Sequence, residues 1–215
     1  MSNLVKFSGS NLPPVSSLVA TLRSMDVGAT AGGNVGSVIL KMDKTGHWCF
    51  GSDQTEIETD STWAVNPYSF VHGYIAWGDG AVLGEKLVPI TQPLPELSPA
   101  PSGAAKGWEQ QVGMGVKCLT GADEGVDARF TTTSVGGKKF VQALAVLIAT
   151  QVEADQTKPV PVILLKKDHY QHKSYGRIFT PAFELVKFIS MTGGGDDSDA
   201  PEEAPAVTAR RRRTM

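Results

Sequence analysis

The sequence predicts a mainly β fold with one long amphipathic helix, and three observations lead to this prediction. Short segments rich in β-branched and aromatic residues are separated by Gly, Pro, Asn and Asp turns, which is typical of strands. One segment, residues 135–154, spaces its apolar residues at three and four, as one face of a helix requires. Beyond residue 193 apolar residues almost disappear, so no further strand or helix is expected there.

Length and composition predict one globular domain of a soluble protein. The chain has 215 residues, of which 41% are hydrophobic, and this is enough for a substantial core. The formal net charge of −2 excludes a generally cationic binder, so any nucleic-acid contact must come from local patches. Two cysteines, no recognisable signal peptide and no apolar run near ~20 residues predict a reduced, cytoplasmic protein without a membrane segment.

The first half of the chain is predicted as an extension followed by strands. Residues 1–36 form an N-terminal extension with a short helix after Pro13 and Pro14. Residues 37–50 form a hairpin whose turn ends at Gly46. Strand-like text over residues 62–90 is interrupted at Asn66-Pro67 and at Gly78-Asp79-Gly80, and the proline-rich residues 91–107 form a surface loop.

The second half contains the helix. Residues 108–119 and 126–133 are predicted as strands joined by a turn at residues 121–125. Ser134 is the expected N-cap of the helix, and Pro159 prevents the helix from continuing. Residues 160–165 read as a buried strand, and a turn at residues 174–176 leads into a last strand, residues 177–189, bent at Pro181.

The order of many strands, one helix and two more strands matches a five-stranded Greek-key barrel of the OB type, with the helix between its third and fourth strands. The OB-like barrel occupies residues 37–192, and residues 193–215 form a disordered tail, acidic first and arginine-rich at its end. A β-sandwich or an α+β roll would show a similar spacing of turn residues between strands, so both stay open as alternatives.

One stretch interleaves cations and rings more densely than any other: residues 166–179, KKDHYQHKSYGRIF. Cations suit phosphates and flat rings suit unpaired bases, so this composition is typical of a surface that follows a single nucleic-acid strand. The predicted backbone contacts are Lys166, Lys167, Lys173 and Arg177, and the predicted stacking rings are Tyr170, Tyr175 and Phe179. The alternative is a solvated strand pair whose rings pack inward.

Rings also crowd the first half of the chain. Alternation places Trp48 and Phe50 on one face of their strand, and Tyr74 and Trp77 on opposite faces of theirs. These four are predicted as further stacking rings, with core packing as the alternative. Other cations can contact phosphates, although each is better explained as an ordinary solvated charge: Lys41, Lys44, Lys86, Arg129, Lys138 and Lys139.

The tail adds a resemblance. Asp196, Asp197, Asp199, Glu202 and Glu203 follow three glycines, after the basic-aromatic stretch. A barrel of this kind with an acidic C-terminus resembles phage-type single-stranded-DNA-binding proteins. The resemblance implies a tail that competes with DNA for the binding groove and recruits replication proteins in the host cytoplasm. Arg210–Arg213 depart from the pattern, because such tails usually end acidic, and this puts the recruitment of partners in doubt.

Enzyme and metal chemistry find little support in the sequence. Residues 134–139, SVGGKK, precede a helix but lack the spacing of a phosphate-binding loop. His47-x-Cys49 and His169-x-x-His172 are not zinc spacings, so no metal or other cofactor is expected. The predicted function is therefore non-enzymatic, sequence-independent binding of single-stranded nucleic acid, with DNA favoured, in phage or mobile-element replication or recombination. The alternative is a protein-interaction or virion-assembly component, and a homo-oligomer is compatible with both.

Overall fold

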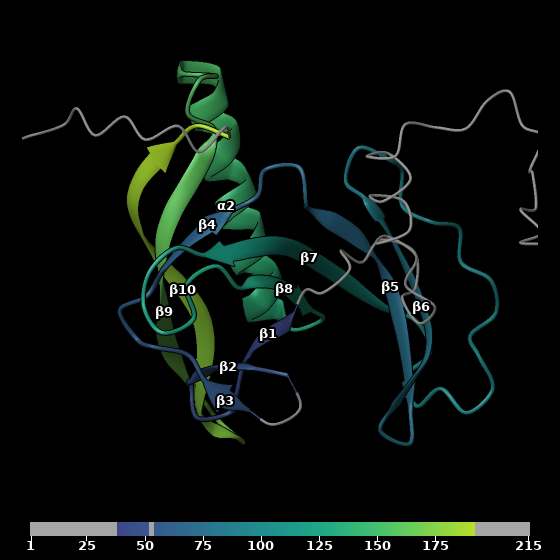
Figure 1. Ribbon diagram of the computed structural model, residues 1–215. Helices are drawn as coiled ribbons and strands as arrows, with labels where there is room; N and C mark the ends of the chain where they lie inside the picture. The colour runs from purple at the N-terminus through teal and green to yellow at the C-terminus, as the bar shows by residue number, and fades with distance from the viewer. Residues whose placement is uncertain (1–37, 52–53, 192–215) are drawn as a thin grey trace, which may run out of the picture.

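A computed structural model describes residues 38–51 and 54–191 (Figure 1). Within these ranges the chain forms strands and one helix, so the mainly β prediction is confirmed. The elements are β1 Val38–Met42, β2 Trp48–Phe50, β3 Thr55–Glu56, β4 Thr62–Val65, β5 Val71–Gly78, β6 Ala81–Pro89, β7 Glu109–Cys118, β8 Asp127–Thr132, α2 Val135–Ala154, β9 Val160–His172 and β10 Gly176–Ile189. The predicted N-terminal extension with its short helix and the predicted tail, residues 193–215, lie outside the described residues.

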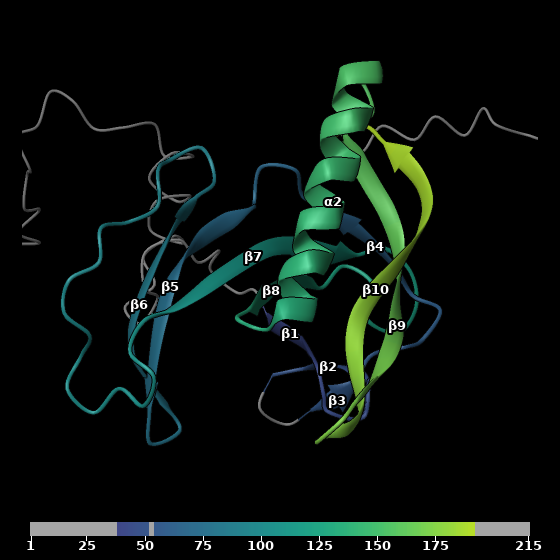
Figure 2. The same ribbon diagram turned by 180° about the vertical axis from the view of Figure 1, so that it is seen from behind.

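The strands form a single curled sheet in the order β10-β9-β4-β7-β8-β1-β2-β3. Five of them, β4, β7, β8, β9 and β10, pair antiparallel with one another along this path. Counted in chain order, α2 lies between the third and the fourth of these five strands, as the sequence predicted. The sheet curls around one side of the helix in the manner of a half-barrel (Figures 1 and 2).

The two ends of the curled sheet approach each other without a ladder of hydrogen bonds. β1 pairs parallel with β8, and β2 and β3 follow it antiparallel. The indole Nε1 of Trp48 on β2 donates to the backbone oxygen of Lys166 on β9, at 2.9 Å. Gly46, in the β1–β2 turn, lies so close to Phe179 that a Cβ there would stand 2.7 Å from the ring. The closure therefore depends on one side-chain hydrogen bond and one tight packing contact.

Strands β5 and β6 extend from the barrel as a two-stranded wing, residues 71–89. β7 holds the wing because its first half pairs with β5 and its second half with β4. The proline-rich loop, residues 91–107, packs across one face of this wing. Lys86 on β6 donates to the Glu96 carbonyl, and the indole of Trp108 donates to the carbonyl of Ser98. The wing lies on the opposite side of the molecule from the β9–β10 hairpin (Figure 1).

The helix α2 fills the concave side of the sheet. The Ser134 hydroxyl accepts from the Gly137 amide at 3.0 Å, which confirms the predicted N-cap. Phe140, Val141, Leu144 and Ile148 are buried, and they share one core with sheet residues such as Trp63 and Met114. The β9–β10 ladder continues through Pro181 without a shift of register. The irregularity that the ladder shows lies between Leu185 and Lys187.

Candidate nucleic-acid interface

The basic-aromatic stretch forms most of a long hairpin, with β9 and β10 paired from Val160 to Ile189. Directly paired residues point to the same face of a sheet, so the register sorts the side chains. Lys167 pairs with Pro181 and His169 with Phe179, on the face that turns toward the β1–β2 turn. Tyr170 pairs with Ile178 and lies on the other face. The hairpin thus divides the predicted contacts between two sides.

A cavity of about 530 Å³ lies where this hairpin meets the β1–β2 turn and the end of β8. We call it the hairpin groove, and its functional lining consists of Lys41, Lys44, Thr132, Tyr175, Arg177 and Phe179. Three segments far apart in sequence contribute these residues. Tyr175, Arg177 and Phe179 belong to the predicted set, whereas Lys41 and Lys44 had seemed ordinary solvated charges. Only the folded chain brings them together.

The hairpin groove carries more positive than negative charge. Within the described residues, Lys41, Lys44 and Arg177 form no ion pair. The carboxylate in the lining belongs to Asp43, whose Oδ1 accepts from the amides of Thr45 and His47, each at 2.8 Å. Burial raises the pKa of Asp43, but these bonds and the Thr45 hydroxyl outweigh it, so the pKa lies below its ordinary value. Asp43 thus holds the turn, while the three cations stay free to bind anions.

The two aromatic rings of the groove differ in their accessibility to solvent. The side chain of Tyr175 is 79% exposed and lies over His172, with ring centroids 4.8 Å apart. Phe179 is half-buried beneath Gly46, beside His169, and the Lys167 ammonium lies 5.3 Å from its centroid. A nucleic-acid base has access to the face of Tyr175, whereas Phe179 mainly supports the wall.

The remaining hairpin residues of the predicted set have separate environments. The ammonium of Lys166 lies 3.8 Å from a carboxylate oxygen of Glu184, so part of its charge is compensated. Lys167 and Lys173 are exposed, the second in the turn at the tip of the hairpin. Tyr170 is 50% exposed and lines a neighbouring cavity instead of the hairpin groove.

The prediction that Trp48 stacks on bases is wrong. Its side chain is buried, and its ring packs between Phe130 and Phe140, with a ring-centroid distance of 5.6 Å to each. Its N–H donates to the backbone oxygen of Lys166. Phe50, on the same strand, is partly buried and packs against Trp63 at 6.1 Å. Alternation placed these rings on one face correctly, but that face is the core, where an aromatic ring contributes to packing.

Tyr74 and Trp77 belong to β5 of the wing, and the wing lies on the opposite side of the molecule from the β9–β10 hairpin (Figures 1 and 2). Tyr74 is partly buried on the face covered by the loop of residues 91–107, whereas Trp77 is 41% exposed. Along the sheet, β7 and β4 separate β5 from β9. The structure therefore does not bring these two rings together with the hairpin rings.

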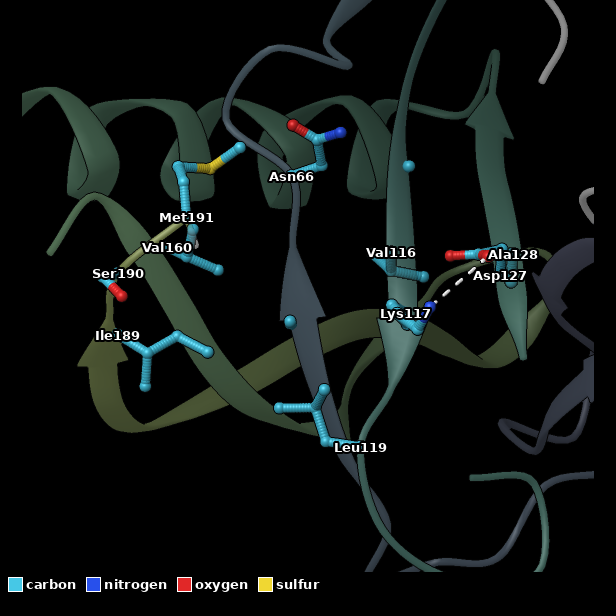
Figure 3. Close-up of a pocket in the computed structure, with 12 residues that line it drawn as sticks. Asn66, Val116, Lys117, Leu119, Asp127, Ala128, Val160, Ile189, Ser190 and Met191 are labelled. Carbon is cyan, nitrogen blue, oxygen red and sulfur yellow. Dashed lines mark ion pairs between the residues drawn. The ribbon is translucent and has the colours of Figure 1, made fainter. Parts of the chain in front are cut away.

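Two other cavities adjoin the barrel. One, of about 610 Å³, is lined by Lys139 and Phe140 of α2 together with Tyr170, Thr180 and Pro181. The other, of about 260 Å³, lies by the ends of β4, β9 and β10 (Figure 3). The walls of this smaller cavity are mostly apolar, and its Lys117 pairs with Asp127 at 3.7 Å. It offers a nucleic-acid strand no unpaired cation.

Among residues 38–51 and 54–191, no three His, Cys, Asp or Glu side chains gather closely enough to hold a metal ion. In the described part of the chain, no helix has the length and apolar character to cross a bilayer. Comparison of the chain with models of protein families, with curated proteins and with solved structures gave no match.

Proposed function

We propose that this protein binds single-stranded nucleic acid, preferentially DNA, without strong sequence preference and without catalysis. The observation that carries the proposal is the hairpin groove, which is lined by the exposed ring of Tyr175 and by three cations without ion pairs in the described structure, Lys41, Lys44 and Arg177. Backbone phosphates bind such cations in any sequence. Every base has a π-face that can stack on a tyrosine, so stacking adds affinity but little selectivity.

The position of the groove in the barrel supports the same proposal. In OB-type barrels, oligonucleotides bind along the second and third strands and between the loops that join strands one and two and strands four and five. Here the turn of the β9–β10 hairpin joins the fourth and fifth strands of the five-stranded core. The wing is inserted between the first and the second strand. The β9–β10 hairpin, which lines the hairpin groove, thus corresponds in chain order to one of the two connections that contact a strand in such barrels.

The wider role remains part of the proposal. The resemblance to phage-type single-stranded-DNA-binding proteins favours a role for this protein in phage or mobile-element replication or recombination, in the cytoplasm of the host. The acidic residues 196–203 supply charges that can compete with DNA for Lys41, Lys44 and Arg177. The same residues are the candidates for contacts with replication proteins, and Arg210–Arg213 offer additional phosphate contacts.

The salt dependence of binding tests the proposal. Fluorescence anisotropy of labelled oligo-dT, measured at several salt concentrations, gives the slope of log K against log salt. Each phosphate contact on a single strand contributes about −0.7 to this slope, so Lys41, Lys44 and Arg177 contribute about −2. We expect the double variant K44A/R177A to weaken binding and to make the slope shallower by about 1.4. Lys158, exposed beyond the other end of α2, provides the matched control K158A, which should change neither quantity.

Two results would overturn the proposal. One is the absence of oligo-dT binding at low salt by the wild-type protein. The other is a K44A/R177A slope equal to that of K158A, since the groove would then make no phosphate contacts. A double-stranded competitor and an oligo-rU competitor, measured in the same assay, establish the preference for single strands and for DNA.

The exposed wing favours a second candidate function, protein–protein interaction. Within the described residues β6 pairs with β5 alone, so no described strand covers the other edge of this nine-residue strand. Trp77, Val82 and Leu83 are exposed near this edge, at 41%, 49% and 40%. Light scattering after size-exclusion chromatography distinguishes the two functions. An assembly component forms an oligomer whose size is unchanged by added oligo-dT and is reduced by V82K.

A further inference from the structure

The cavity beside the hairpin groove extends the candidate interface around the free edge of β10. We call it the side cavity, and it has a volume of about 610 Å³. Its lining combines Lys139 of α2 with Tyr170 of β9 and with Thr180 and Ala182 of β10. Lys139 is exposed and forms no ion pair among the described residues, and Tyr170 is 50% exposed. A cation and an accessible ring therefore occur together here, as they do in the hairpin groove.

The two cavities meet at Pro181, which lines both of them. β10 pairs with β9 on one side only, so nothing in the described sheet covers its other edge at this point. Gly136, in the first turn of α2, packs on Thr180 of β10, and a Cβ at this position would stand 2.6 Å from the Thr180 methyl group. The start of the helix therefore lies close against the strand between the cavities, without a side chain of its own at that contact.

The dimensions suit a short stretch of single strand. From Arg177 in the hairpin groove to Phe183 in the side cavity, β10 covers about 20 Å at ~3.3 Å per residue. A footprint of about four nucleotides, the lower end of the range for OB-type barrels, fits this length. The first turn of α2 has no acidic residue, and Lys138 and Lys139 lie at its end, so the start of the helix contributes no carboxylate that opposes a phosphate.

We propose that a single strand bound in the hairpin groove continues across β10 at Pro181 into the side cavity. There Tyr170 stacks on a base and Lys139 contacts a phosphate. This inference rests on the proposed function and adds the path of the strand to it. It also gives separate roles to the two tyrosines of the hairpin, since Tyr175 serves the groove and Tyr170 the side cavity.

A length series of oligo-dT tests the path. Oligonucleotides from dT2 to dT12 are titrated into the full-length wild-type protein and into the variants Y170L, Y170F, K139A and K158A. We expect Y170L and K139A to leave the affinity for the shortest oligonucleotides unchanged, because these fill the hairpin groove alone. For oligonucleotides longer than about four nucleotides, which reach the side cavity, Y170L should lose at least about fivefold in affinity, the lower limit for a stacked base. Y170F keeps the ring and should bind as the wild type does, and K158A is the control for charge.

Three results would overturn the path. The first is no loss with Y170L and K139A at any length, and the second is an equal loss at all lengths. The third is a loss with Y170F as large as that with Y170L, because the ring would then not act by stacking. The proposed function fails separately, through loss of all oligo-dT binding by the wild type or through an unaffected K44A/R177A variant. Thermal unfolding of each variant identifies any change caused by a failure to fold.

Discussion

Replacement of Trp48 by phenylalanine isolates the contact that closes the curled sheet. The variant W48F keeps an aromatic ring between Phe130 and Phe140 but removes the N–H that donates to the Lys166 carbonyl at 2.9 Å. A partly buried carbonyl left without this donor costs about 1–3 kcal/mol. The smaller ring adds the loss of a few buried atoms, about 1 kcal/mol. The free energy of unfolding should therefore fall by about 2–4 kcal/mol.

Urea unfolding followed by far-UV circular dichroism measures this change without relying on the tryptophan that is removed. The matched control is W77F, since Trp77 is 41% exposed on the wing and its replacement should alter stability by no more than about 0.5 kcal/mol. A W48F variant as stable as W77F would refute the reasoning that Trp48 joins β2 to β9. Gly46 and Phe179 lie beside this contact. W48F should therefore also weaken oligo-dT binding, although it replaces none of the side chains that line the groove.

Further predictions concern the thiols, the wing and the β1–β2 turn. Burial raises the pKa of both Cys49 and Cys118, so a thiol reagent at neutral pH should modify them only after denaturant is added. A Cβ at Gly73 would overlap the Lys86 carbonyl oxygen, so G73A should open the wing to limited proteolysis, whereas the wild-type wing should resist. The pKa of Asp43 lies below its ordinary value of 3.8, so its stabilising effect is complete above that value and is lost as pH falls through the folded pKa. The difference in unfolding free energy between wild type and D43N should therefore shrink from neutral pH to about pH 3, and a constant difference would contradict this.

Much of the fold follows from local patterns in the sequence. The apolar spacing of residues 135–154 and the cap at Ser134 define α2, because both signals act within a few residues of each other. The hairpin that contains Lys166–Phe179 follows in the same way from strand residues on both sides of a glycine turn. The place of the helix between the third and fourth core strands came from element order alone.

The candidate site is less accessible to such reasoning. Alternation shows that Trp48 and Phe50 share a face, but only the packing of α2 decides that this face is the core. Lys41 and Lys44 look like ordinary surface charges until the parallel pairing of β1 with β8 carries them beside Arg177. The residues of a strand do not specify which distant strand it pairs with. The pairing of β1 with β8 therefore cannot be predicted from local sequence patterns.

The same distant pairing has a consequence for the order of events during synthesis. The walls of the hairpin groove come from residues 41–44, 130–134 and 175–181, so the groove closes only after nearly the whole domain has been made. Contacts this far apart in sequence form late, because the chain between them must first lose its freedom. A nascent chain that lacks the β9–β10 hairpin therefore has no assembled groove. If the proposed function holds, its affinity for single strands arises only after that hairpin has been made.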